Sequence, residues 1–483
     1  MGRIYAGLVL AALWGAGCGR TEEPTAAEPI ERHLDGSRIK AKAVSTEDGL
    51  RWFQQLYDSQ RQEPCLWQKA APDGAYYCVG ITASPLGVIR RTSQENNYAD
   101  DRCTLPLLYF SQAPRPDALI PMGGGTCDEP QRFHSLGKVW GQSYYHLEPN
   151  GDCLPDVRHA NELYPVGPLV EPGDYFVRGT LREKQHGGGI KAYVIAGEDG
   201  SESFQSLHDT THATECAVRL ARDGKFRCLP VDEPMGVSDF VSVEPTCTER
   251  ALTTLFRVAC TPPRFALLSD NPEACHPEVS VIAVGKEVRA PFAYGGTSST
   301  CTQFTPGPGF TSYYRAGSEL PARSWPEAKE LDLEVHGRLT VRGMEVAGAV
   351  KIPTELFDTG LGVRCTFERV PAGTLRCIPS TDSPLFQPRY FADAACTTPV
   401  TPRYRIACTA DRYATFHDAS GPTPGVRVYN LGPRHEGTVY LSPSAGPPYT
   451  SCMEIERKPQ DAFYLLGAEV DPTSLVQGIE TMN

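Results

Sequence analysis

Three aspartates occupy places in the sequence where a carboxylate could do chemistry. Asp58, Asp209 and Asp358 each follow Leu-x and precede Ser or Thr. Such carboxylates could act as general acids or bases, or could bind a cation. A catalytic site needs one asymmetric group of residues, whereas an aspartate that forms a turn recurs in every copy of a repeated unit. We therefore predict that all three shape turns.

Other short motifs resemble parts of known active sites. His186-Gly-Gly-Gly189 matches an esterase oxyanion loop, but the chain has no Gly-x-Ser-x-Gly nucleophile elbow. Ser37-Arg-Ile-Lys40 and Ser269-Asp-Asn271 match two motifs of serine β-lactamases, and the third, Lys-Thr-Gly, is absent. Gly123-Gly-Gly-Thr126 lacks the Lys-Ser/Thr of a phosphate loop. The sequence thus favours a protein that is not an enzyme, with an extracytoplasmic hydrolase as the alternative, and predicts no catalytic residue.

The cysteine content indicates an exported protein. Of 17 cysteines, setting aside Cys18 leaves 16, an even number that allows eight disulfides. A zinc site requires close ligand pairs such as Cys-x-x-Cys, which the chain lacks. His134 and His276 have no partner at ligand spacing, so we expect them at the surface. No metal and no cofactor is predicted.

Three segments predict β-hairpins closed by disulfides. Cys65–Gly80, Cys216–Pro230 and Cys365–Pro379 each contain two cysteines around a turn with Gly, which accepts the positive φ of a tight turn. Apolar residues lie two positions inward from each cysteine, so the cysteines of a hairpin should be cross-strand partners. Further pairs follow from short separations and from elimination. The predicted disulfides are Cys65 with Cys78, Cys216 with Cys228, Cys365 with Cys377, Cys103 with Cys127, Cys247 with Cys260, Cys396 with Cys408, Cys275 with Cys301, and Cys153 with Cys452.

Ordered landmarks recur about every 150 residues, which predicts three β repeats at 35–175, 176–325 and 326–483. Leu50, Phe53 and Leu56 have helical spacing, but the third repeat has Pro353 in the same stretch, so an edge strand fits better. About eight short strands per repeat suggest an all-β, six-bladed, propeller-like ring with two blades per repeat. Three separate β-sandwich domains are the alternative.

Composition and the first residues predict the location. The 45 glycines and 42 prolines suit a β protein, and a net charge of −12 argues against nucleic acid as a partner. Residues 1–17 read as a signal peptide that ends in small residues before Cys18. We expect Cys18 to carry a lipid and residues 18–34 to form a tether to the membrane. Plain secretion is the alternative.

The lipobox-like start, the Cys...Gly...Cys-x-Pro hairpins and the Tyr/Phe-Ala-Asp-x-x-Cys blocks resemble uncharacterised bacterial cysteine-rich lipoproteins. The blocks include Tyr98 to Cys103 and Phe391 to Cys396. This resemblance implies a lipoprotein, and Gly19 after the cysteine implies the outer membrane, facing the periplasm or the surface. It implies no activity.

One loop differs between the copies and is the candidate binding loop. Cys103 and Cys127 are 24 residues apart, against 13 for Cys247 to Cys260. The extra length mixes aromatic and charged residues, which is typical of binding loops. The candidate residues are Tyr109, Phe110, Arg115 and Asp117. We expect a lipid-anchored envelope scaffold that binds a glycan or a protein, or else a purely structural envelope protein.

Overall fold

The computed structural model confirms an all-β chain. Its described residues form mainly strands, with turns and short 3-10 helices between them. They span 28–482 apart from connecting segments. These segments are 70–73, 81–96, 111–113, 115–116, 123–131, 149–150, 157–162, 232–240, 243, 249–250, 256–262, 270–276, 289–292, 296–300, 305–309, 382–388, 404–411, 419–424, 443–451 and 458–461.

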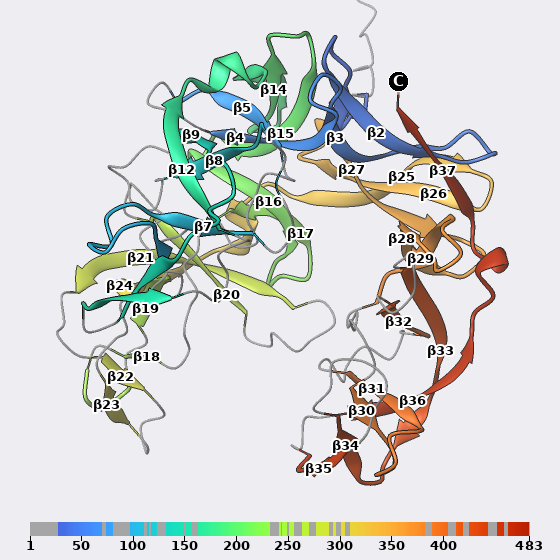
Figure 1. Cartoon of the computed structure of the whole chain (residues 1–483). Helices are drawn as coiled ribbons and strands as arrows, with labels where there is room; N and C mark the ends of the chain where they lie inside the picture. The colour runs from blue at the N-terminus through green and yellow to red at the C-terminus, as the bar shows by residue number, and fades with distance from the viewer. Residues whose placement is uncertain are drawn as a thin grey trace, which may run out of the picture.

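A large antiparallel sheet occupies the upper part of the molecule as drawn in Figure 1. It consists of three runs of five strands, which we call the central runs. The first contains β37 (Gln477–Met482), β2 (Ile39–Ser45), β3 (Arg51–Asp58), β4 (Glu63–Lys69) and β5 (Tyr76–Gly80). The second contains β13 (Arg178–Gly187), β14 (Ile190–Gly197), β15 (Glu202–Asp209), β16 (Thr214–Leu220) and β17 (Phe226–Pro230). The third contains β25 (Ala328–His336), β26 (Leu339–Val346), β27 (Val350–Asp358), β28 (Val363–Arg369) and β29 (Leu375–Pro379).

The C-terminal strand belongs to the first central run, although it is farthest from that run in sequence. β37 pairs with β2 on one side and with β29 on the other. It follows η4 (Pro472–Ser474), just as η2 (Pro172–Asp174) precedes β13 and η3 (Ala322–Ser324) precedes β25. β37 therefore holds the place in the first run that β13 and β25 hold in the second and third.

Within the described residues, each central run is followed by a group of seven further strands, which we call an arm. An arm has four strands in one sheet and three in a second, and in the third arm the two sheets are joined. The first arm holds β7 (Leu107–Tyr109), β12 (Leu163–Val170), β9 (Arg132–Leu136) and β8 (Leu119–Met122), with β6 (Asn97–Tyr98), β10 (Tyr144–Leu147) and β11 (Cys153–Asp156). The second holds β19 (Ala251–Leu255), β24 (Phe310–Leu320), β21 (Val279–Val288) and β20 (Phe265–Ser269), with β18 (Val241–Ser242), β22 (Ala293–Gly295) and β23 (Thr302–Phe304). The third holds β31 (Pro399–Arg403), β36 (Ala462–Glu469), β33 (Gly425–His435) and β32 (Tyr413–Asp418), with β30 (Tyr390–Phe391), β34 (Val439–Leu441) and β35 (Met453–Ile455).

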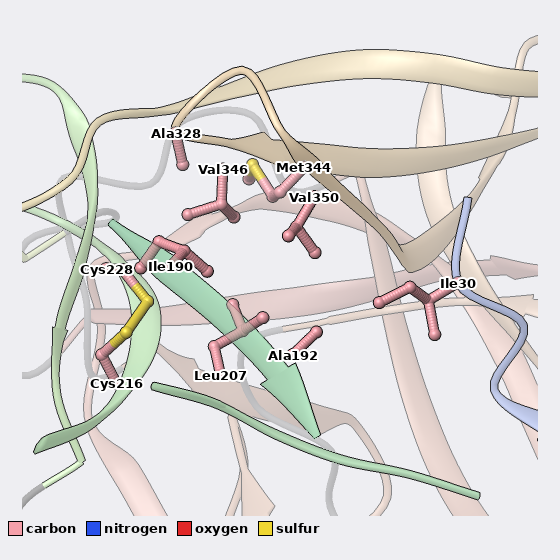
Figure 2. Close-up of a cluster of buried hydrophobic side chains, with 10 residues drawn as sticks. All are labelled: Ile30, Ile190, Ala192, Leu207, Cys216, Cys228, Ala328, Met344, Val346 and Val350. Atoms are coloured by element: carbon pink, nitrogen blue, oxygen red, sulfur yellow. A yellow bond between two sulfur atoms is a disulfide. The ribbon is translucent and has the colours of Figure 1, made fainter. Parts of the chain in front are cut away.

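The central runs pack against each other through apolar faces. Alternating residues of β14, such as Ile190 and Ala192, face Val346 and Val350 of the third run, and Ile30 from the start of the described chain joins them (Figure 2). The stretch around Pro353 is a strand, β27, but the predicted edge strand is wrong, because β26 and β28 pair with it on its two sides. β28 pairs only with Leu356 to Asp358, so no β28 residue lies opposite Pro353. Pro353 thus avoids a place where its missing N–H would break a ladder.

The three hairpin disulfides are confirmed, with one correction to their geometry. Cys65 bonds to Cys78, Cys216 to Cys228, and Cys365 to Cys377. The cysteines are not directly opposite, because Cys65 faces Gly80 and Cys78 faces Trp67. Each bridge therefore joins diagonal neighbours, which also lie within reach of one another across a sheet.

The other predicted pairings are wrong. Each arm is closed by a longer bridge, and the pairs are Cys103 with Cys153, Cys247 with Cys301, and Cys396 with Cys452. This overturns Cys103 with Cys127, Cys247 with Cys260, Cys396 with Cys408, Cys275 with Cys301, and Cys153 with Cys452. Cys127, Cys260, Cys275 and Cys408 lie outside the described residues.

The Asp-x-x-Cys turn explains why short separations mislead. Cys103 and Cys396 have positive φ values of 52° and 58°. In the first arm the carboxylate of Asp100 accepts hydrogen bonds from the main-chain N–H groups of Thr104 and Leu105, at 2.9 and 2.8 Å. The turn presents its cysteine to the start of β11, about 50 residues later.

Candidate functional site

Residues 28–34, which we call the strap, lie among the central runs instead of forming the end of a tether. Ile30 is 4% exposed, and its N–H donates to the carbonyl of Lys351 at 2.9 Å. β1 (His33–Leu34) pairs with β15, and the N–H of Phe204 donates to the carbonyl of Arg32. The predicted tether of 18–34 is therefore wrong from residue 28 onward, because this segment buries apolar surface.

Arg32 extends the contacts of the strap to the other two runs. Its guanidinium lies 5.5 Å from the ring centre of Trp52 in the first run. It also donates to the carbonyl of Pro353 in the third run, at 2.9 Å. The strap thus contacts all three central runs, and it connects parts of the sheet that are remote in sequence.

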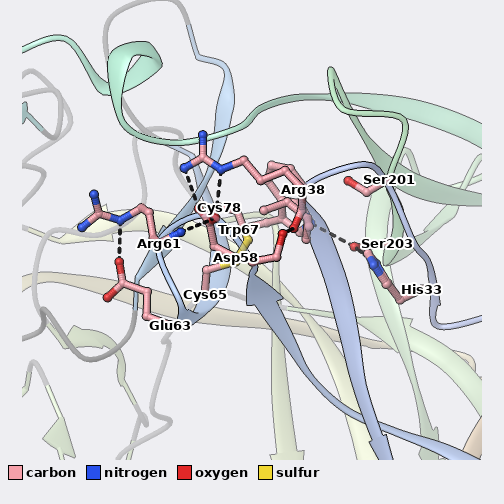
Figure 3. Close-up of a disulfide and its surroundings, with 12 residues drawn as sticks. His33, Arg38, Asp58, Arg61, Glu63, Cys65, Trp67, Cys78, Ser201 and Ser203 are labelled. Carbon is pink, nitrogen blue, oxygen red and sulfur yellow. Dashed lines mark hydrogen bonds and ion pairs between the residues drawn. A yellow bond between two sulfur atoms is a disulfide. The ribbon is translucent and has the colours of Figure 1, made fainter. Parts of the chain in front are cut away.

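His33 anchors the strap in a buried polar cluster (Figure 3). Its Nδ1 lies 2.8 Å from Ser203 Oγ, and the same oxygen accepts a hydrogen bond from Trp67 Nε1 at 2.9 Å. An indole N–H can only donate, so the Ser203 proton is free to be donated to His33 Nδ1. This assigns a neutral imidazole with its proton on Nε2, which faces Asp35 at 3.4 Å. The His33 side chain is fully shielded from solvent.

The electrostatics of the cluster favour the neutral form. Burial lowers the pKa of His33, and the nearby carboxylates of Asp35 and Asp199 oppose that shift without cancelling it. Hydrogen bonds, among them those from the main-chain N–H groups of Arg38 and Ile39, hold the pKa of the Asp199 carboxyl below its ordinary value, although its partial burial acts the other way.

Serine, histidine and aspartate are the residue types of a hydrolytic triad, but their placement here does not suit one. Ser203 is 6% exposed and sits beneath Trp67 and the strap. A nucleophile must reach the carbonyl that it attacks, and its base must be able to take a proton there. The cluster is built for holding the strap.

The prediction that the repeated aspartates shape turns is confirmed. All three are fully buried. Asp58 Oδ1 accepts from the N–H groups of Gln60 and Arg61, and Asp358 Oδ1 accepts from those of Gly360 and Leu361. A guanidinium completes each site, from Arg38 at 2.6 Å and from Arg338 at 2.6 Å.

In the second run a histidine, and not an arginine, pairs with the buried aspartate. Gly189 stands where the other runs have arginine, and the buried carboxylate of Asp209 is bonded at 2.6 Å by His212 Nδ1. The His212 ring stacks on Trp325 at 3.8 Å between centroids. We read this pair as a structural replacement for the arginine, because Asp209 is inaccessible.

We expect His212→Ala to destabilise the protein by about 1–3 kcal/mol, because it leaves a buried carboxylate with main-chain partners only. His208→Ala is the control, since His208 lies in β15 next to Asp209 but outside this pair. Chemical denaturation would measure both. A His212 variant as stable as the control would contradict the structural role.

The candidate binding loop was identified from a comparison of cysteines that are not equivalent in the structure. Cys127 follows β8, whereas Cys260 and Cys408 precede β20 and β32. The connections that correspond to each other are 110–118, 256–264 and 404–412, each nine residues long, so the first arm has no insertion there. Phe110 is 7% exposed and packs edge-on against Tyr164, and Tyr109 is half-buried. The exposed Asp117 pairs with Arg61 at 3.3 Å, and Arg115 lies outside the described residues.

The other motifs singled out in the sequence do not converge. His186 is exposed and pairs with Glu183 at 2.9 Å, and His134 bonds the carbonyl of Gly167. Ser37 lies at a turn, and its main-chain N–H donates to the carbonyl oxygen of Asp199. Ser269 ends β20, whereas Asn271, His276 and Gly123-Gly-Gly-Thr126 lie outside the described residues. Within the described ranges no three potential metal ligands come together, and no helix there has the length and apolarity of a membrane span.

Sequence reasoning missed His33, Ser203 and Asp199, because none of them recurs in all three copies. Asp199 belongs to a Glu-Asp-Gly turn, whose equivalent in the first run is Glu47-Asp48-Gly49. That partial repeat was the available signal. His33 carried none, since it lies before the first repeated landmark.

Fold and disulfides define an all-β protein of an oxidising compartment outside the cytoplasm. The model of a family of unknown function, DUF7481, matches residues 27–322, and the chain belongs to that family. No curated protein and no solved structure matches the chain. The matched range begins just before the strap and ends at η3, so it covers the first central run except β37, the second central run, and the arms of both.

Proposed function

We propose that the protein is a non-enzymatic, lipid-anchored envelope protein of the bacterial outer membrane, and that its disulfide-bonded scaffold binds a glycan or a protein through its arms. The observation that carries this is the arms themselves. Each has seven described strands and its own disulfide, and lies outside the sheet that supplies the stable core. Rigid, separately fixed surfaces reduce the ordering cost of binding.

We further propose that the three central runs close into the predicted ring, with an arm in place of the second blade of each repeat. Contacts between hairpin tips and turns support a cyclic order. Ser37 of the first run donates its N–H to Asp199 of the second, at 2.9 Å. Gly188 of the second lies against Ala347 of the third, where a Cβ would come within 2.5 Å of its carbonyl oxygen. His336 of the third contacts the carbonyl of Asp48 in the first, at 3.4 Å.

Main-chain bonds at the strand ends follow the same order. The donors Cys78, Cys228 and Cys377 bond the carbonyls of Val177, Pro326 and Val476 at 3.1, 2.9 and 2.9 Å. The first joins run one to run two, and the second joins run two to run three. The last joins run three to the segment that leads into β37 of run one. Three equivalent junctions are what a closed ring of repeats requires.

Binding through the arms can be tested with purified protein. We expect it to co-sediment with envelope glycan polymer or to capture a specific envelope protein. A variant with Cys396→Ser and Cys452→Ser should lose binding to the third arm while its central sheet stays folded. Failure of the intact protein to bind either class of ligand would overturn the proposal.

We expect Cys18→Ser to move the protein from the membrane fraction to the soluble envelope fraction, because the lipid on Cys18 is its proposed membrane anchor. Fractionation of cells followed by immunoblotting would measure the shift. Substitution of Ser37, which lies inside the folded part, is the control. Retention of the Cys18 variant in the membrane would contradict lipid anchoring.

A further inference from the structure

We propose that the strap is a pH-dependent latch: protonation of His33 releases residues 28–34 from the three central runs while the runs stay folded. The latch is independent of whether Cys18 carries a lipid. It follows from the hydrogen-bond directions around His33, from the burial of its ring, and from the small number of bonds that hold the strap.

The hydrogen bonds around Ser203 favour neutral histidine over the protonated form. Ser203 Oγ accepts from Trp67 Nε1, and the unprotonated Nδ1 of neutral His33 is the acceptor that its own proton can reach. In a protonated imidazole both ring nitrogens donate. Two donors would then converge on Ser203, and its hydroxyl proton would need another acceptor. Among the described residues Ser203 Oγ is hydrogen-bonded only to Trp67 and His33.

Two carboxylates and one aromatic ring lie near His33. Asp35 lies 3.4 Å from Nε2, but Arg51 shares that carboxylate at 4.0 Å. Asp199, on the β14–β15 turn, is the second nearby charge, and its carboxylate accepts from Ile39 N at 2.6 Å. Phe53 places its ring centre 6.1 Å away. Burial outweighs both carboxylates, so the pKa of His33 is lowered.

Lowering the pH shifts the equilibrium from bound strap to free strap. A histidine with a lowered pKa in the bound strap takes up its proton more readily when the strap is free. At pH values well above about 6.5 both forms are neutral, and the strap stays bound. As the pH falls below that value, the free form gains protons first, and bound strap is lost. The change continues until the pH reaches the lower pKa of bound His33.

The strap can leave without the rest of the fold. Its main-chain bonds are few, and they involve Ile30, Arg32 and the short strand β1. The central runs have their own ladders and hairpin disulfides. Local opening of segments with few bonds costs less than global unfolding. Release would expose the edge of β15 and add seven residues, roughly 25 Å, to the chain that precedes the first run.

Hydrogen exchange of the purified full-length protein between pH 7.5 and 5.0 tests the latch. After correction for the intrinsic pH dependence of exchange, we expect strap amides to lose protection by up to tenfold per pH unit below about 6.5. Peptides from β28 and β29 should keep their protection. Loss of protection in β28 and β29 together with the strap would mean general unfolding and would overturn the proposal.

Two variants and one control make the test specific. His33→Gln cannot be protonated, so its strap should show no extra loss of protection at pH 5.0. His33→Arg carries a permanent charge and should have a released strap even at pH 7.5. His186→Gln, at an exposed histidine, should behave like the unchanged protein. The proposal fails if His33→Gln keeps the full pH dependence, or if strap protection is the same at both pH values in the unchanged protein.

Discussion

Removal of residues 477–483 is expected to open the central sheet between its first and third runs and to cost at least about 5 kcal/mol of stability, because it removes β37. β37 makes four ladder pairs with β2 and two with β29, and each main-chain hydrogen bond contributes about 0.5–1.5 kcal/mol net. Gly478 also fits between Val44 and Phe367, which would become exposed. The expected loss is a large part of the stability of an ordinary domain.

Chemical denaturation and hydrogen exchange of β2 and β29 would measure this effect. Glu480→Gln is the matched control, because it removes the ion pair with Arg369 but keeps the strand. That exposed pair should contribute only about 0–1 kcal/mol. A synthetic peptide of residues 472–483 should restore protection in the truncated chain. A truncated chain as stable as the full one would mean that β37 does not close the sheet.

The parts of this fold that could be predicted from the sequence are local and repeated. Two cysteines around a Gly turn specify a hairpin because strand alternation and turn geometry act over a few residues. A Tyr-x-x-Gly motif also recurs, at Tyr164 to Gly167, Tyr314 to Gly317 and Tyr464 to Gly467. Its glycine is required because a Cβ on Gly317 would come within 2.6 Å of the Ala283 carbonyl oxygen on the neighbouring strand. Such constraints recur in each copy, so the sequence shows them three times.

The other features of the fold depend on contacts between segments that are far apart in the sequence, and no local pattern encodes such contacts. The sequence of β37 alone does not show that this strand pairs with β2 at the other end of the chain. The strap was predicted as tether because its composition is polar, yet Ile30 and His33 are buried by three runs at once. The arm disulfides were missed for a similar reason. Sequence proximity favours Cys127 for Cys103, whereas the turn at Asp100 directs Cys103 toward β11.

Loss of the arm disulfide is the second large effect that we expect. In the third arm Cys396 and Cys452 are 56 residues apart, and a loop of that length restricts the unfolded chain by about 4 kcal/mol in the chain-entropy model. The hairpin bridge between Cys365 and Cys377 spans 12 residues and should contribute about 3 kcal/mol. The arm is also small, so it has little apolar core to compensate.

The two double serine variants separate these contributions. Removing Cys396 and Cys452 should unfold the third arm locally, so that β34 and β35 lose protection from hydrogen exchange while β27 and β28 keep theirs. Removing Cys365 and Cys377 should instead weaken the central sheet, because that bridge lies in the apolar core between the first and third runs. The division into arms and central runs is wrong if both variants lower protection across the whole chain to the same extent, since the arms would then not be separate cooperative units.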